Sequence, residues 1–350
     1  MEKLTIDGRL IGPGEPPYII AEIGSNYNGD MRLCKKLIDS AKKCGADAVK
    51  FQSWSKSSLI CKAEYERNTS YTDKKRHFGS LEEMVEKYQF TPEQHIEVKK
   101  YCKKKDITFL SSCFSKNEVD LLYDLDVPVF KIPSMDVPNI PLLQYVATKH
   151  RPVILSTGMA TLGEIERAVQ ILQNGGSGPI ALLHCIAIYP PSYETIHLRN
   201  MGMLSIAFDV PVGFSDHSLG TAIPLAAIAL GACVIEKHFT LDKNLEGWDH
   251  AISADPPELE TIVREGKNIF HALGNTMRIV NEAEMEKRKK FRRRIVMKRA
   301  MKKGETICID DIDFKRPGNG IHPDEIKYVI GRTLQRDVQF DDELEWSDLI

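Results

Sequence analysis

Eight short apolar segments, each followed by a helix-like stretch, constrain the fold of this 350-residue chain more than any other feature. Several are nearly continuous apolar runs, as is typical of parallel strands buried on both faces. The predicted strands are Tyr18–Gly24, Ala46–Ser53, Ile107–Cys113, Val129–Ser134, Pro152–Gly158, Ile180–Ile186, Val210–His217 and Cys233–Thr240. Eight β/α repeats favour an α/β fold of the closed (β/α)8, or TIM, barrel type. An open doubly wound sheet would be expected to carry a GxGxxG turn after its first strand, and the chain has none there.

Signals for helix ends separate these strands. Ser115–Glu118 and Thr161–Glu164 are both capping-box patterns, which predict helix starts. Thr91–Pro92 supplies an N-cap followed by proline at the first helical position, and Gly175–Gly176 is typical of a helix end. The pattern therefore alternates between strand and helix as a barrel requires.

The bulk composition predicts a soluble cytoplasmic protein. The formal net charge is −2, so no overall field favours nucleic acid or an anionic membrane. No apolar run approaches the roughly 20 residues of a membrane helix, and the first nine residues lack the apolar core of a secretory signal. The eight cysteines are scattered without a CxxC pair, so we expect buried free thiols in a reducing compartment.

Two regions depart from the repeat. An insertion at Trp54–Phe90 is charged and aromatic (Tyr65, Tyr71, His77, Phe78), and we expect an active-site loop there. The alternative is a disordered surface loop.

After about residue 275 the chain becomes highly charged and then rich in residues that favour β-strands. We predict a barrel domain over 1–275, a linker over 276–292 and a small β-rich domain over 293–350. The basic run in the linker could suggest nucleic acid, but a solvated linker explains it better because acidic residues precede it.

Polar residues gather at the predicted carboxyl ends of the strands, where barrel enzymes carry their chemistry. They are Glu22, Lys50, Gln52, Ser112, Lys131, Ser134, Ser156, Tyr189, Ser215, His217, His238 and, just beyond, Asp249. Lys50 and Lys131 lie inside apolar strands, and a buried ammonium must be paired or functional. Together with the hydroxyls they predict a cradle for a phosphate and a carboxylate. Pairing with structural carboxylates and a Schiff-base lysine are the alternatives.

Two histidines end successive strands and predict a metal site. His217 and His238 could share one divalent ion, and each follows a carboxylate, Asp216 or Glu236 in the local sequence. Imidazole with water or substrate oxygens suits Mn²⁺, Fe²⁺, Co²⁺ or Zn²⁺. The alternative is that the imidazoles are hydrogen-bonded within the barrel core. An enzyme is therefore the leading interpretation.

Taken together, these segments resemble the sialic acid synthase family, the PEP-dependent nonulosonate synthases. The matching stretches are Ile20–Gly24, Gly45–Gln52, Phe130–Ser134, Leu155–Met159, Gly213–His217, Glu236–Thr240 and Gly247–His250. The tail Phe314–Gly320 resembles the family's C-terminal antifreeze-like (SAF) domain. The motifs are collinear with the family over nearly the whole chain.

The resemblance implies a transferase that condenses phosphoenolpyruvate (PEP) with an N-acylated hexosamine aldehyde, giving a nine-carbon nonulosonic acid and phosphate. The predicted metal ligands are His217 and His238, for Mn²⁺ most of all, with Mg²⁺ or Co²⁺ as alternatives. The predicted PEP ligands are Lys50, Ser112, Lys131, Ser134 and Ser215, with Ser156 beside them. Glu22 would handle a proton or water at the pyruvyl carbon. Gln52, Asp136, Tyr189 and Asp249 would line the sugar site, and Arg316 would come from the partner in a domain-swapped homodimer.

Three positions depart from the family pattern: Tyr27 replaces histidine, Ala187 replaces asparagine and Asp136 replaces glutamate. They leave the sugar open, with legionaminic, pseudaminic or spore-coat products as alternatives to N-acetylneuraminate. They also motivate a second interpretation, a catalytically degenerate sugar-binding protein. A PEP-dependent synthase acting on a pentose or tetrose phosphate is a further rival, but it needs a second phosphate site that the strand ends do not offer.

Overall fold

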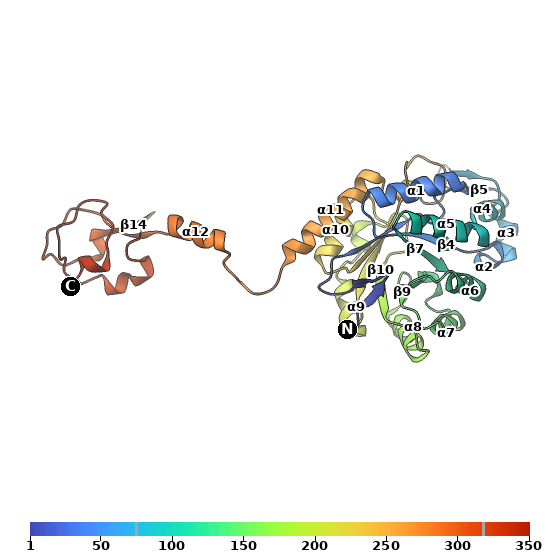
Figure 1. Cartoon of the computed structure of the whole chain (residues 1–350), viewed down its shortest axis with the longest axis horizontal. Coiled ribbons are helices and arrows are strands. Elements are labelled where there is room, and N and C mark those ends of the chain that lie inside the picture. The colour runs from blue at the N-terminus through green and yellow to red at the C-terminus, as the bar shows by residue number, and fades with distance from the viewer. Residues whose placement is uncertain (74–75, 317–318) are drawn as a thin grey trace. The chain divides into compact units, whose positions relative to one another are not determined.

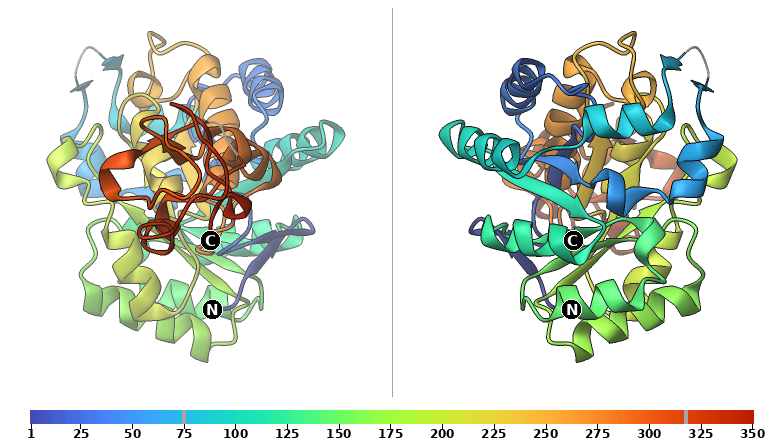
Figure 2. Two further views of the ribbon diagram at one scale, coloured as in Figure 1. Left: turned by 90° about the vertical axis from the view of Figure 1, so that its left-hand side faces the viewer. Right: turned by 90° about the vertical axis from the view of Figure 1, so that its right-hand side faces the viewer.

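The computed structural model describes residues 1–73, 76–316 and 319–350, which form two compact units, Met1–Gly274 and Asn275–Ile350. The first unit is a closed barrel of parallel strands (Figures 1 and 2). The strands are β3 (Tyr18–Glu22), β4 (Ala48–Ser53), β7 (Thr108–Cys113), β8 (Phe130–Ile132), β9 (Val153–Ser156), β10 (Ile180–Cys185), β11 (Val212–Asp216) and β12 (Val234–His238). They pair in chain order, and β12 closes on β3. The predicted barrel is confirmed, with strands slightly shorter than predicted.

Helices surround this barrel (Figure 1). They are α1 (Met31–Lys43), α5 (Pro92–Lys104), α6 (Lys116–Asp124), α7 (Ile140–Ala147), α8 (Leu162–Asn174), α9 (Asn200–Phe208), α10 (Ala222–Ala229) and α11 (Pro256–Leu273). Their apolar faces and the outward-facing strand residues form one large buried cluster. This alternation of strand and helix leaves the carboxyl ends of all eight strands at one end of the barrel.

A hairpin that was not predicted from the sequence packs against the inward-facing residues of the barrel. Strands β1 (Leu4–Ile6) and β2 (Arg9–Ile11) are antiparallel. Leu4, Ile6 and Ile11 are fully buried in a cluster with inward-facing strand residues such as Ile154 and Val234. The hairpin therefore supplies apolar side chains to the barrel interior, away from the polar strand ends.

The predicted helix signals are confirmed with one exception. Thr161 caps α8 with a complete capping box, Thr91 caps α5 with proline next in the chain, and Gly176 adopts a φ of +81° after α8. The Ser115 box is wrong. Its partner Glu118 instead accepts a hydrogen bond from the Phe114 amide at 2.7 Å and another from the Ser58 hydroxyl, so this carboxylate ties α6 to the insertion.

The insertion is a folded segment. It contains α2 (Lys56–Leu59), α3 (Lys62–Arg67), β5 (Tyr71–Asp73), β6 (Arg76–Phe78) and α4 (Leu81–Tyr88). An apolar cluster of its own includes Trp54, Tyr65, Leu81, Met84, Val85 and Tyr88. The side chains of Tyr71, His77 and Phe78, which stood out in the sequence, are not among those that the structure describes. This cluster gives the segment a core, so the alternative of a disordered loop is wrong for its described part.

The second unit contains α12 (Glu282–Phe291), β13 (Arg294–Met297), β14 (Ile312–Lys315) and short 3-10 turns. Helix α12 is exposed throughout and occupies most of the predicted linker. The two strands pair antiparallel beside several isolated bridges, around an apolar core that includes Ile295, Met297 and Leu344. Pro317 and Gly318, which belong to the tail motif, lie outside the described residues.

All eight cysteines are free, as predicted, but Cys61 and Cys308 are exposed rather than buried. Within the described ranges, none of the helices combines the length and apolar character needed to cross a membrane.

Candidate active site

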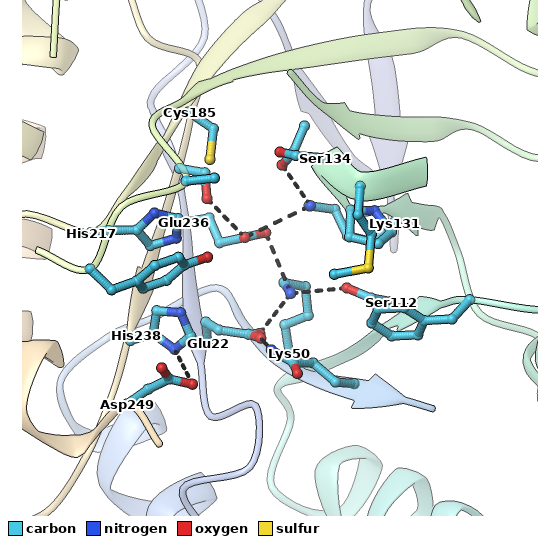
Figure 3. A pocket seen from close by; sticks show the side chains of 18 of the residues that line it. Glu22, Lys50, Ser112, Lys131, Ser134, Cys185, His217, Glu236, His238 and Asp249 are labelled. Atoms are coloured by element: carbon cyan, nitrogen blue, oxygen red, sulfur yellow. Dashed lines mark hydrogen bonds and ion pairs between the residues drawn. The ribbon is translucent and has the colours of Figure 1, made fainter. Parts of the chain in front are cut away.

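A cavity of about 400 Å³ opens at the carboxyl ends of the barrel strands. Twelve of the predicted site residues line it: Glu22, Lys50, Gln52, Ser112, Lys131, Ser134, Ser156, Tyr189, Ser215, His217, His238 and Asp249. Ten of the cavity side chains are labelled in Figure 3. Most of these groups come from residues of the strands themselves, so the barrel fixes their positions. We call the charged and hydroxyl-bearing part the floor, defined by Glu22, Lys50, Ser112, Lys131, Ser134, Ser156, Ser215 and Glu236.

Lys50 is paired on the floor with two carboxylates. Its Nζ lies 2.8 Å from Glu22 Oε2 and 3.7 Å from Glu236 Oε2, and it donates to Ser112 Oγ at 3.2 Å. Burial, opposed by Lys50 and reinforced by Glu236, raises the pKa of Glu22 to about 7. Gln52 also donates to Glu22, at 2.8 Å. Glu22 can therefore take up or release a proton near neutral pH.

Lys131 lies on the other side of Glu236, as Figure 3 shows. Its Nζ is 2.7 Å from Ser156 Oγ and 3.9 Å from Glu236 Oε1. Burial lowers the pKa of Lys131 despite the nearby carboxylate. An additional anion in the cavity would favour the ammonium form, because an opposite charge favours ionisation.

The two histidines lie side by side at the carboxyl ends of the neighbouring strands β11 and β12. Their ring centroids are 5.5 Å apart, and Tyr189 stacks on His217 at 3.9 Å. His217 Nδ1 donates to the Ile186 carbonyl at 2.8 Å, which leaves its Nε2 with a lone pair. Burial lowers the pKa of His217 to about 4 and that of His238 to about 3. Both imidazoles are therefore neutral at physiological pH, the form in which histidine binds metals.

The donor chemistry of this pair fits a divalent ion. His238 Nδ1 is buried and, among the residues described, has no hydrogen-bond partner, although Asp249 Oδ2 is 3.9 Å away. Within the same described part of the chain, no three His, Cys, Asp or Glu side chains are grouped as a metal site. A metal held here would thus use His217 and His238 and fill its other positions with oxygens from solvent or substrate.

A buried ion pair lies behind the histidines, on the opposite face of the same strands. Lys237 Nζ is 2.6 Å from Asp216 Oδ2 and donates to the Ser218 carbonyl at 2.7 Å. Asp216 also accepts from the Ser218 amide at 2.8 Å. Asp216 and Lys237 are paired across β11 and β12, so this bridge holds together the two strand ends that carry His217 and His238.

Two predicted residues are placed elsewhere. Asp136 is not in the cavity lining; one of its oxygens accepts from Asn139 at 2.8 Å, because the 3-10 turn after β8 directs the carboxylate to the start of α7. Arg316 lies in the second unit, where its guanidinium is 5.2 Å from the Phe291 ring centre. Of the three departures from the family pattern, Ala187 lines the cavity, whereas Tyr27 stacks on Phe90 at 4.4 Å outside it.

Glu236 is a floor residue that was not predicted from the sequence. Side chains alternate along a strand, so Glu236 shares the inner face with His238 while Lys237 points the other way. That alternation was the signal in the sequence that could have identified Glu236. It also shows that Asp216 and Glu236 are not equivalent neighbours of the histidines, because Asp216 faces outward with Lys237 and Glu236 faces the cavity. The remaining cavity residues are mostly apolar and come largely from loops, which no strand pattern predicts.

Comparisons with known proteins agree with this architecture. A model of the NeuB family matches residues 37–278, and an SAF domain model matches residues 292–350. The N,N'-diacetyllegionaminic acid synthase of Campylobacter jejuni is 41% identical, over 93% of this chain and 97% of that protein. The human N-acetylneuraminate-9-phosphate synthase is 34% identical, over 98% of this chain and 95% of that protein.

A solved structure shows the same relationship in three dimensions. It is the N-acetylneuraminic acid (sialic acid) synthetase of Leptospira borgpetersenii serovar Hardjo-bovis in complex with citrate, which is 36% identical with a TM-score of 0.72. The match covers 82% of this chain and 95% of that one. The chain therefore belongs to the NeuB family of nonulosonic acid synthases, and is a transferase-type enzyme that combines a (β/α)8 barrel with an SAF domain.

Proposed function

We propose that the enzyme condenses PEP with the aldehyde form of an N-acylated hexosamine, releasing phosphate and forming a nine-carbon nonulosonic acid. The single observation that supports this most is the floor, where two buried lysines and four serines lie beside a pair of neutral histidines. Ammonium and hydroxyl groups suit a ligand that carries both a phosphate and a carboxylate. Family membership supports the same reaction class.

Lys50, Lys131, Ser112, Ser134, Ser156 and Ser215 would hold PEP on this floor. Ser134 is oriented because its Oγ accepts from the Gly158 amide at 2.9 Å, and Ser215 because it donates to Glu236 at 3.1 Å. The contribution of this cradle is mainly orientation, since the charge on the bound anion changes little before phosphate leaves.

The sugar would lie between this floor and the cavity mouth, beside Gln52, Tyr189 and Asp249. His217 and His238 would hold a divalent ion, Mn²⁺ for preference, next to the reacting aldehyde. When bound, such an ion supplies Lewis-acid stabilisation of the negative charge that develops on the aldehyde oxygen. Asp249 Oδ2 lies 3.9 Å from His238 Nδ1, so it borders the same point.

The reaction balances with one water. Carbon 3 of PEP attacks the aldehyde carbon, forming the new C–C bond, and the aldehyde oxygen gains a proton to become a hydroxyl. The cationic carbon 2 takes up the oxygen of water, and the water proton passes to a base. The C–O bond to phosphate then breaks, and the new hydroxyl on carbon 2 becomes the ketone as its proton passes to the departing phosphate. The first proton released by water is the one that the aldehyde oxygen gains. Glu22 would be that base, because a carboxylate with a pKa of about 7 can both accept and return a proton at neutral pH.

A phosphate-release assay tests this proposal. PEP and Mn²⁺ are supplied in parallel with N-acetylmannosamine, 2,4-diacetamido-2,4,6-trideoxymannose or 2,4-diacetamido-2,4,6-trideoxyaltrose. We expect sugar-dependent phosphate release with at least one of them. Absence of release with all three, from folded protein that binds Mn²⁺, contradicts the proposal and favours the sugar-binding alternative.

The metal assignment has its own test. His238→Ala removes one imidazole and little apolar packing, so we expect it to fold normally, to lose Mn²⁺ binding in a calorimetric titration and to lose phosphate release. His150→Ala, at an exposed histidine outside the cavity, is the matched control. Unchanged Mn²⁺ affinity in His238→Ala would contradict the assignment.

We also propose a cytoplasmic homodimer in which Arg316 acts on the partner's site. Arg316→Ala in the full chain should then reduce turnover while sedimentation still shows a dimer. A monomeric enzyme with full turnover would contradict both points.

A further inference from the structure

Asp249 reaches the active-site cavity from a loop rather than from a strand. It belongs to residues 239–255, which connect β12 to α11. Its carboxylate nevertheless lies 3.9 Å from His238 Nδ1, as Figure 3 shows. A loop of this length keeps one conformation only where contacts to the rest of the fold hold it. The contacts around Asp249 therefore decide where its carboxylate lies.

The first anchor of this loop is His250, the residue next to Asp249. His250 is fully buried; its Nε2 lies 3.2 Å from Asn28 Oδ1, and its Nδ1 lies 2.6 Å from the Thr240 hydroxyl. The Asn28 amide is oriented because its Nδ2 donates to the Glu246 carbonyl at 2.7 Å, so its Oδ1 accepts from His250 Nε2. In the neutral imidazole, Nδ1 then accepts from the Thr240 hydroxyl. The ring thus ties the loop to the end of β12 and to the segment after β3.

The chain at Gly247 is packed against the same two side chains. A methyl group added to Gly247 would lie 2.7 Å from His250 Nε2 and 2.9 Å from Asn28 Oδ1, closer than a real Cβ atom can approach. Gly247 and His250 flank Trp248 and Asp249, both of which line the cavity. These two cavity residues are therefore held from both ends.

A second anchor holds the backbone of Asp249 itself. The Ser253 hydroxyl donates to the Asp249 carbonyl at 2.6 Å and accepts from Asn26 Nδ2 at 2.9 Å. The same amide nitrogen donates to the Phe239 carbonyl at 2.9 Å, and Asn26 is fully buried. Since Asn26 also follows β3, both anchors rest on the same segment of the barrel.

We propose that His250 and Ser253 are positioning residues for Asp249 in sugar binding. This inference rests on the proposed function, in which Asp249 borders the sugar. Neither His250 nor Ser253 lines the cavity, so their effect on the sugar passes through the loop that they hold. PEP and the metal would be held mostly by residues of the barrel strands. Loss of an anchor should therefore weaken binding of the sugar and spare binding of PEP and Mn²⁺.

The first test removes the acceptor for His250. Asn28 has a φ of +52°, which glycine adopts without strain, so Asn28→Gly deletes the amide and keeps the backbone conformation. On whichever of the three sugars supports turnover, we expect the KM for the sugar to rise about tenfold, because a misplaced binding group is costly. The KM for PEP and the Mn²⁺ affinity should stay at their wild-type values. Asn174→Gly, at an exposed asparagine that ends α8, is the matched control.

Two further variants separate this role from a general loosening of the fold. Asn28→Asp keeps an acceptor for His250 Nε2 and should recover most of the sugar affinity. Ser253→Ala frees the Asp249 carbonyl with little change in volume, and we expect it to raise the sugar KM in the same selective way. It also serves as the test if Asn28→Gly does not fold.

A double variant shows whether the effect passes through Asp249. In Asp249→Ala the positioned carboxylate is absent, so adding Asn28→Gly should raise the sugar KM no further. Multiplicative effects of the two substitutions overturn the inference. An unchanged sugar KM in folded Asn28→Gly and Ser253→Ala, or an equal rise in the KM for PEP, overturns it as well and leaves the proposed function standing. Absence of phosphate release from the wild-type enzyme with every sugar is the separate outcome that removes the proposed function.

Discussion

The floor and the outer wall of the cavity are built in opposite ways. The floor consists of ionisable and hydroxyl groups on strand ends, where each group is fixed by several neighbours: Glu236 contacts Lys50, Lys131 and Ser215. The outer wall consists of apolar side chains on loops and the insertion, and several of them are held by packing against the insertion's apolar cluster. It is made by Trp54, Leu59, Ile60, Phe114, Met135, Met159 and Trp248. The difference teaches that the charged groups of the cavity are tied to the barrel, whereas its apolar lining can change with the loops.

The largest effect should follow from breaking the floor. In Lys50→Met, Glu22 and Glu236 lose the ammonium that lies between them, and PEP loses a positive charge, so we expect phosphate release to fall by about 10³-fold with every sugar. Lys42→Met removes a lysine paired with Asp106 at 3.0 Å outside the cavity and should leave turnover unchanged. A Lys50→Met enzyme that changes sugar preference while keeping kcat would show that the floor recognises the sugar instead.

A second effect concerns the free energy of unfolding, to which the buried ion pair of Lys237 and Asp216 contributes. Lys237→Met leaves Asp216 fully buried without its partner, and breaking such a pair costs about 3–5 kcal/mol. We expect urea unfolding to show this loss and the double variant with Asp216→Asn to recover much of it. A single variant as stable as the double would mean that the pair does not hold β11 to β12.

A smaller effect should follow from narrowing the floor. A methyl group at Gly158 would lie 3.0 Å from Ser134 Oγ and 3.2 Å from Cys185 Sγ, so Gly158→Ala must displace the serine by a few tenths of an ångström. Misplacing a ligand group of this kind should raise the KM for PEP by about tenfold, with the ratio between sugars unchanged. Gly163→Ala, in open space at the start of α8, is the control.

The smallest effect concerns the hydrogen bond from Trp54 of the outer wall to Gln52, which in turn contacts Glu22 on the floor. Trp54→Phe keeps an aromatic ring in the insertion's cluster but removes the N–H that orients Gln52. A neutral hydrogen bond is worth about 1 kcal/mol, so we expect kcat/KM to fall by about fivefold. A much larger fall in kcat/KM, without any loss of stability, would show that the positions of the floor groups depend on the outer wall. That result would contradict the separation of the two regions.

The strands and most floor residues could be predicted because short-range patterns determine them. Continuous apolar runs marked the strands, and polar side chains at their ends marked Lys50, Lys131 and the histidines. Glu236 was missed because its inward direction depends on the period-2 alternation along β12. The predicted Ser115 cap failed for a related reason, since Glu118 is bonded to the distant Ser58, a contact that no local pattern contains.

The outer wall could not be predicted because it depends on tertiary packing. Trp54 and Trp248 are far apart in the sequence and meet only in the folded barrel. The hairpin of β1 and β2 was missed for a similar reason. Strands of three residues carry almost no periodic signal, and their burial inside the barrel is set by the strands they pack against.

The most direct test of the account is a crystal structure grown with Mn²⁺ and PEP, with anomalous scattering recorded to locate the metal. We predict an anomalous peak at the imidazoles of His217 and His238, and the phosphate and carboxylate of PEP against Lys50 and Lys131. A metal bound away from both histidines, or PEP seated away from both lysines, would contradict the assignment of the metal and PEP to these groups.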